Sequence, residues 1–248
     1  MTYCLIQLQV KNTLKINNMK YIINAPDSLK YITEPTTKIL DIKVKEYENF
    51  FEVEKYRDII INYFDNINDF RKFIYKLRGN NTSLPEYAEG TYDNGMINAF
   101  IDPNIPINSG KYNIKVHMAS HELFHIMYME LVLKNNYSKR IIWFDEGMAQ
   151  LFSGEFDSLN DENNFKDFYL SVRKETKLIP NLNSIDHGKS FCNEKYNGYN
   201  LSYLAVRYLY EIMDSNTFKK LISDTNKILE IGKTVVKKAF CYYEEKFK

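Results

Sequence analysis

The sequence predicts an α+β fold in which a small mixed sheet is followed by a mostly helical C-terminal half. Short runs rich in β-branched and aromatic residues, typical of strands, lie before residue 103. An apolar stretch without Gly or Pro, residues 116–133, is long enough for a buried helix. After residue 142, apolar residues recur mainly with helical spacing. These three observations place the strands first and most of the helices second.

The first elements are predicted in chain order. Residues 1–25 alternate weakly and form either a strand or a loose extension. Met19 is an alternative start, which would make residues 1–18 dispensable. Spaced Leu and Ile residues predict a helix over 28–51, and Pro35 is expected to interrupt its beginning.

A strand, a helix and a hairpin are predicted next. Residues 57–64 indicate a strand, and residues 68–77 a helix that ends at Gly79. After a polar loop, two further strands are expected at about 87–93 and 96–102. They are separated by an Asn-Gly pair, which is a strong signal for a hairpin turn.

The C-terminal half is predicted to be helical, with a polar and uninformative part between residues 155 and 198. We expect a single domain over residues 26–248, with sub-lobes of about 26–135 and 136–248. Trp143, the only tryptophan, is expected in the core. The predicted helices are 145–152, 165–172, one beginning at 197–209, 214–224 and 232–248.

Composition indicates a globular protein and excludes several classes. The chain has 248 residues, 44% of them hydrophobic, and a formal net charge of +1 without a basic block. We therefore expect no nucleic-acid partner. Three widely spaced cysteines do not indicate a disulfide framework. No signal peptide or membrane-spanning run is visible, so the expected location is cytoplasmic, without a membrane partner.

The most informative motif is His121-Glu122-Leu123-Phe124-His125 within the long apolar helix. Two histidines four residues apart lie on one helical face, so both imidazoles can bind one metal ion. A buried pair of this kind is costly unless something satisfies it. Glu122 points about 100° around the helix, toward the open coordination position.

A third ligand is offered by Glu146, which follows His125 after twenty intervening residues. Two histidines and one glutamate form a known catalytic zinc set that keeps one position for water. His121, His125 and Glu146 are therefore the predicted Zn²⁺ ligands, with Glu122 as general base. The alternative is a pair of core histidines bonded to backbone carbonyls, with both glutamates solvated.

The His-Glu-x-x-His motif, followed by Trp143-Phe144-Asp145-Glu146-Gly147-Met148-Ala149, resembles the gluzincin zinc peptidases, which include thermolysin-like enzymes and zinc aminopeptidases. A metzincin would need Gly and His where Tyr128 and Leu131 stand. The resemblance implies a zincin-like fold with an edge strand beside the active-site helix. It assigns that edge to residues 96–102, where a peptide or protein substrate would pair by β-augmentation.

The same resemblance bears on specificity. Zinc aminopeptidases carry a G-x-M-x-N segment whose Glu anchors the free amine, whereas Gly95-Met96-Ile97-Asn98 is shorter and lacks that Glu. We therefore expect an endopeptidase, with an aminopeptidase as the alternative. A catalytically silent zinc- or peptide-binding sensor of the same fold is a further alternative, and retention of Glu122 argues against it.

Further polar residues are candidates for supporting roles. Tyr199, and after it Tyr203, is predicted to stabilise the oxyanion, as Tyr or His does in the family; either tyrosine can instead be a core residue. His187 is a weaker candidate for the same role. Gln150 can hold a ligand histidine by its second nitrogen. His117 is a supporting group, a substrate contact or an ordinary helix residue.

Overall fold

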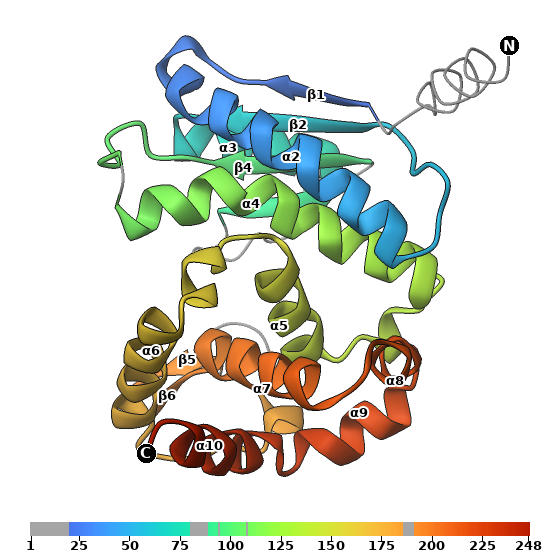
Figure 1. Cartoon of the computed structure of the whole chain (residues 1–248). Coiled ribbons are helices and arrows are strands. Elements are labelled where there is room, and N and C mark those ends of the chain that lie inside the picture. The colour runs from blue at the N-terminus through green and yellow to red at the C-terminus, as the bar shows by residue number, and fades with distance from the viewer. Residues whose placement is uncertain (1–19, 80–88, 94, 108, 186–190) are drawn as a thin grey trace, which may run out of the picture.

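The computed structural model describes residues 20–79, 89–93, 95–107, 109–185 and 191–248, and within them the fold is α+β, as predicted. A four-stranded sheet with three helices forms the upper part of Figure 1, and six helices form the lower part. The predicted alternative start, the possible extension over residues 1–18 and the polar loop after Gly79 lie outside the described residues.

The sheet is mixed, with strand order β1-β2-β4-β3. β1 pairs in parallel with β2 and β2 with β4, whereas β3 is antiparallel to β4. The pairing of β1 brings residues 21–24 into the sheet, in agreement with the strand alternative predicted for residues 1–25. The strands are β1 (Tyr21–Asn24), β2 (Ile59–Phe64), β3 (Gly90–Asp93) and β4 (Met96–Phe100).

The predicted hairpin is confirmed, but the predicted edge strand is wrong. Asp93 lies opposite Met96, and Gly95 takes a positive φ of 81°, as a tight turn requires. The expected edge, residues 96–102, corresponds to β4, and β4 is internal. One side of β4 is already paired with the parallel strand β2, so its hairpin partner β3 takes the outer position.

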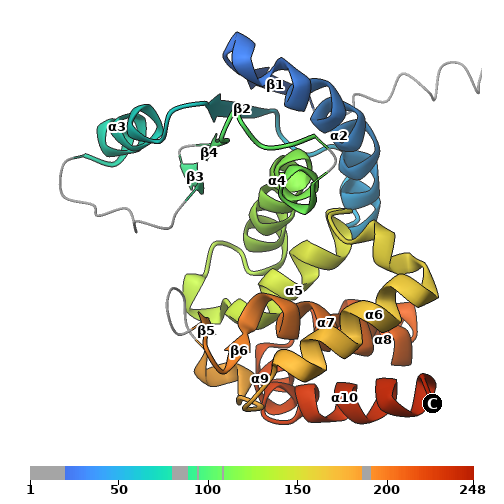
Figure 2. The ribbon, with the colours of Figure 1, turned by 90° about the vertical axis from the view of Figure 1, so that its left-hand side faces the viewer.

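Two helices cover one face of the sheet and one covers the other (Figure 2). α2 (Lys30–Phe50) and α4 (Gly110–Met127) lie on the first face, and α3 (Ile67–Arg78) lies on the second. β2 alternates accordingly, because its first, third and fifth residues join the main core while Phe64 packs with α3. α4 therefore lies on the sheet, and it carries the His121-Glu122-Leu123-Phe124-His125 motif.

Pro35 does not interrupt α2, contrary to the expectation. Proline lacks an N–H and leaves the carbonyl four residues earlier, that of Tyr31, without its helical donor. The Tyr112 hydroxyl of α4 donates to the Tyr31 carbonyl at 3.3 Å. A tertiary contact thus replaces the missing helical hydrogen bond.

The predicted long apolar helix is present, although its last turn differs. The Ser109 side chain accepts from the Tyr112 N–H and caps the start of α4. After Met127 the helix continues as a π-helical turn, Tyr128–Val132. Such turns insert an extra residue and often occur near functional sites.

The lower part consists of helices and a small hairpin. α5 begins three residues before the predicted start. The two predicted closing helices, 214–224 and 232–248, correspond to α8 and α10, and a further helix, α9, lies in the interval between them. The elements are α5 (Ile142–Phe152), α6 (Glu162–Glu175), α7 (Gly198–Ile212), α8 (Ser215–Leu221), α9 (Thr225–Gly232), α10 (Val235–Lys246), β5 (Cys192–Asn193) and β6 (Tyr196–Asn197). The short 3₁₀ turns are Asp27–Leu29, Tyr137–Lys139, Asp157–Asn160 and Leu182–Ser184.

α5 is the buried centre of this lower part. Trp143 is 1% exposed and confirms the predicted core position. α5 packs so closely on α7 that a Cβ at Gly147 would lie 2.4 Å from the Ser202 carbonyl oxygen. Gly147 therefore sets the distance between the two helices. None of the helices in the described ranges has the length and apolarity needed to span a bilayer.

We expect Gly147→Ala to lower the free energy of unfolding by about 1 to 3 kcal/mol, because the added methyl group overpacks a backbone contact. Gly110→Ala is the matched control, since nothing lies within 4 Å of a Cβ at this first residue of α4. Its stability should be unchanged or slightly raised. Urea unfolding followed by circular dichroism measures both, and equal stability of the two variants would contradict the close packing of α5 on α7.

Candidate metal centre

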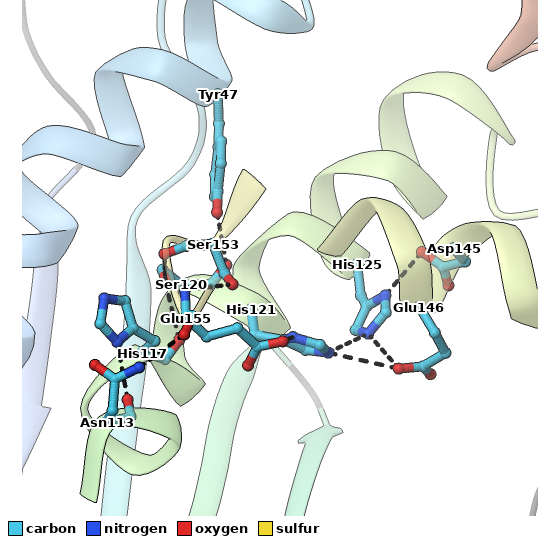
Figure 3. Close-up of polar contacts among 10 residues, drawn as sticks. All are labelled: Tyr47, Asn113, His117, Ser120, His121, His125, Asp145, Glu146, Ser153 and Glu155. Atoms are coloured by element: carbon cyan, nitrogen blue, oxygen red, sulfur yellow. Dashed lines mark hydrogen bonds and ion pairs between the residues drawn. The ribbon is translucent and has the colours of Figure 1, made fainter. Parts of the chain in front are cut away.

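α4 and α5 bring His121, His125 and Glu146 together (Figure 3). The Nε2 atoms of the two imidazoles are 3.0 Å apart. Glu146 Oε2 lies 3.5 Å from each of them. One helical turn separates the histidines, and the carboxylate approaches from the neighbouring helix. Three potential ligand atoms therefore face one point.

These spacings suit a small tetrahedral cation. Zinc binds imidazole nitrogen and carboxylate oxygen at about 2.0 to 2.1 Å, so the edges of its coordination tetrahedron are about 3.3 Å long. The three observed separations, 3.0, 3.5 and 3.5 Å, lie close to that value. The set of donors and their arrangement therefore fit a divalent metal ion.

Asp145 and Arg140 hold the second histidine. His125 Nδ1 donates to Asp145 Oδ1 at 2.7 Å, which leaves the Nε2 lone pair directed toward His121. The Asp145 side chain is fully buried and also accepts from Arg140 Nε at 2.5 Å. Arg140 Nη2 lies 3.5 Å from Glu146 Oε1. One guanidinium therefore positions the carboxylate that orients His125 and the carboxylate of Glu146.

Glu155 faces the Nδ1 atom of His121, as Asp145 faces that of His125. Its Oε1 lies 3.3 Å from His121 Nδ1, although the ring N–H is not aligned for a full hydrogen bond. The chain reverses after α5 at Gly154, whose φ is 90°. This turn brings Glu155 back beside the metal helix, where it is 7% exposed. A carboxylate therefore faces the outer nitrogen of each imidazole.

Buried hydrogen bonds fix the two helices relative to each other (Figure 3). The Ser120 hydroxyl of α4 donates to the Ser153 carbonyl at the end of α5, at 2.8 Å. The Tyr47 hydroxyl of α2 donates to the Ser120 carbonyl at 3.2 Å. These contacts lie next to His121 and limit the movement of α4 relative to α5.

Glu122 lies between two cavities, one beside each of the two histidines. The larger, of about 360 Å³, is bordered by His121 and Glu122 and is called the His121 cavity here. The smaller, of about 210 Å³, is bordered by His125, Glu122 and Tyr92 and is called the His125 cavity. A Cβ added at Gly90 of the edge strand would lie 3.2 Å from Glu122 Oε1. Glu122 thus sits where β3, α4 and both cavities meet.

The two tyrosine candidates occupy different surroundings. Tyr199 is 43% exposed and borders the His121 cavity, with its ring packed edge-on against Phe191. Tyr203 is 1% exposed, and its hydroxyl accepts from Arg207 at 2.9 Å within the core. Of the two, Tyr199 therefore has access to the site.

The remaining candidates are also placed. His117 Nδ1 lies 2.8 Å from the Asn113 carbonyl oxygen one turn earlier, and the His117 ring points away from the ligands, as an ordinary helix residue does (Figure 3). Gln150 borders the His121 cavity, and its Oε1 has no hydrogen-bond partner. Gln150 was expected to hold the second nitrogen of a histidine, but Asp145 faces that nitrogen in His125 and Glu155 faces it in His121. His187 lies outside the described residues.

Sequence reasoning assigned no role to Asp145, Arg140 or Glu155. The sequence could have indicated Asp145, because this residue directly precedes Glu146 within the motif that carries the resemblance. Arg140 and Glu155 lie outside the helices, on either side of α5. Their approach depends on the paths of two connecting segments, for which the sequence has no periodic pattern.

No protein-family model matches the chain, and no curated protein sequence is similar to it.

The carboxylates around the histidines change the protonation of the metal-free site. Burial alone would lower the pKa of His125, but Asp145 and Glu146 outweigh burial and raise this pKa to about 9. Burial would also lower the pKa of His121, but Glu155 and Glu146 outweigh burial and raise it. Burial would raise the pKa of Glu146, yet the two imidazoles hold it well below its usual range. At neutral pH the histidine pair therefore holds a proton that a metal must displace.

We expect Zn²⁺ binding at pH 7 to release at least one proton. The raised histidine pKa values mean that this proton is held below pH 9 and lost above it, so affinity should increase with pH up to about 9. The gain should be about tenfold per pH unit for each proton released. Calorimetry in two buffers of different ionisation enthalpy counts the protons. Binding without proton release, at an affinity independent of pH, would contradict this account.

Proposed function

We infer that the protein is a zinc-dependent metalloendopeptidase with a zincin-like fold. The inference rests on the convergence of His121, His125 and Glu146 beside Glu122, next to the edge strand β3. The gluzincin-like motif in the sequence supports the same reading. His121, His125 and Glu146 would hold the zinc ion. Zinc in such a site supplies Lewis-acid chemistry, which polarises a carbonyl group and makes water a nucleophile near neutral pH.

Glu122 would act as the general base. Its carboxylate faces the meeting point of the two cavities and is partly exposed. From that position a carboxylate oxygen would take the proton of the attacking water and later pass it to the leaving nitrogen. This shuttle needs a carboxylate that is not itself a metal ligand, and Glu122 is separate from the three ligand residues.

Edge strand β3 would bind the substrate backbone. Its outer side has no partner strand among the described residues, so its N–H and carbonyl groups can pair with an extended peptide. The cavities on both sides of Glu122 would then receive side chains from both sides of the scissile bond. Binding on both sides favours cleavage within a chain over removal of a terminal residue.

Tyr199 would stabilise the developing oxyanion. Its ring borders the same cavity as His121 and Glu122 and is supported by Phe191. A phenolic donor placed at the oxygen that gains negative charge contributes about 3 kcal/mol to transition-state stabilisation. Asp145 and Glu155 would meanwhile hold both imidazoles with their Nε2 atoms toward the metal.

We expect Glu122→Gln to lower kcat/KM by about 10² to 10⁴-fold and to leave zinc content unchanged, because it removes the base but no ligand. Glu162→Gln is the matched control, since Glu162 is exposed in the first turn of α6. Cleavage of a quenched-fluorescent peptide library and metal analysis of each purified protein provide the readouts. Chelation of the metal should abolish cleavage by the wild type.

Two results would overturn the proposed function. One is zinc-loaded wild-type protein that cleaves no member of the peptide library. The other is a Glu122→Gln variant that keeps its zinc and cleaves as fast as the wild type.

A further inference from the structure

The His121 cavity has features that the hydrolysis of a peptide bond does not require, and the following inference rests on the proposed function. Three apolar side chains, those of Ile114, Met118 and Phe156, line it. Polar groups of Gln150 and Glu155 also border it. A long side chain with an aliphatic stem and a polar end matches this combination.

Gln150 borders this cavity with a side-chain oxygen that accepts no hydrogen bond. The residue is 5% exposed, and its buried Oε1 has no hydrogen-bond partner. A buried acceptor left without a donor is costly, so native proteins rarely retain one without a reason. A ligand that brings an N–H donor into the cavity would satisfy it.

The charged residues around the cavity indicate which kind of ligand group would donate to Gln150 Oε1. Glu155 borders it and is 7% exposed, and its carboxylate remains when Glu122, which also borders the cavity, is replaced by Gln. Apart from His121, whose Nε2 would hold the zinc ion, none of the cavity-lining residues within the described ranges carries a basic side chain. The His125 cavity differs, because Arg140 borders it. The His121 cavity therefore favours a cationic group over a neutral or anionic one.

The direction of β3 assigns this cavity to one side of the scissile bond. Gly90, at the start of β3, lies against Met118 and Glu122, whereas Tyr92 borders the His125 cavity. β3 thus runs from the His121 cavity toward the His125 cavity. Antiparallel pairing is slightly more stable per residue than parallel pairing, and a peptide paired in this way runs opposite to β3. The residue after its scissile bond would then reach the His121 cavity.

We propose that the His121 cavity selects peptides with Lys or Arg directly after the scissile bond. The aliphatic stem of that residue packs on Ile114, Met118 and Phe156. Its ammonium or guanidinium group donates to Gln150 Oε1 and is attracted by Glu155. Gln150 is therefore a specificity-determining residue, and Glu155 both orients His121 and attracts the basic side chain.

The experiment uses zinc-loaded Glu122→Gln protein to separate binding from cleavage. Paired fluorescent peptides carry lysine or norleucine at one position, so they differ only in the ammonium group, and anisotropy gives their dissociation constants. We expect the lysine peptide to bind about 10- to 100-fold more tightly. Mass spectrometry of a peptide library digested by the wild type should place its cleavage sites before Lys or Arg.

Substitution of Gln150 tests the residue itself. Adding Gln150→Met should reduce the preference for lysine about tenfold and leave zinc affinity unchanged. Lys166→Met, at an exposed position of α6, introduces the same side chain away from the cavity and should leave the preference intact.

The outcomes separate this proposal from the proposed function. Cleavage without preference for a basic residue, or equal binding of the paired peptides, overturns the specificity and leaves the peptidase standing. Lower zinc affinity in Gln150→Met with an unchanged lysine preference also overturns it, because Gln150 would then serve His121. Zinc-loaded protein that neither binds nor cleaves any peptide overturns both.

Discussion

Negative charge buried between α4 and α5 is the constraint on which the site depends. Asp145, Glu146 and Glu155 are each less than 9% exposed, and Arg140 is the guanidinium that contacts the first two. These four side chains together carry a formal charge of −2. Uncompensated charge is expensive in such surroundings, and the same carboxylates raise the pKa of both histidines, which favours protons that offset part of this charge. A divalent cation among the same atoms would offset it completely.

Helix packing determines where that charge can accumulate. Gly147 follows Glu146 directly and lets α7 pack closely on α5, the helix that carries Glu146. On the other side, Tyr47 and Ser120 hold α4 to α2 and to the end of α5. The side chains of His121, His125 and Glu146 therefore lie close together because the packed backbones and the buried hydroxyl groups fix their positions. Their arrangement does not require a bound metal ion.

The sequence was informative where the relevant geometry is local. The four-residue spacing of His121 and His125 alone places both on one helical face, and an Asn-Gly pair alone predicts the hairpin. Strand order is not local: β4 is internal because distant β2 pairs with its other side, which no pattern in residues 96–102 shows. Pro35 illustrates the same limit, since its helix survives through a hydroxyl from α4, eighty-one residues from the carbonyl that accepts it.

The π-helical turn at the end of α4 joins the candidate site to the sheet. In the π turn after Met127, Glu130 accepts from Tyr56 and Arg57, which precede β2, and lies 3.2 Å from the hydroxyl of Tyr92 in β3. A turn with an extra residue changes the direction of the following side chains. Glu130 thus ties the helix that bears His125 to the strand that would bind substrate. In the proposed function, the fold would fix the distance between a peptide on β3 and the atoms of His121, His125 and Glu146 before substrate arrives, which is the preorganisation that a hydrolytic centre requires.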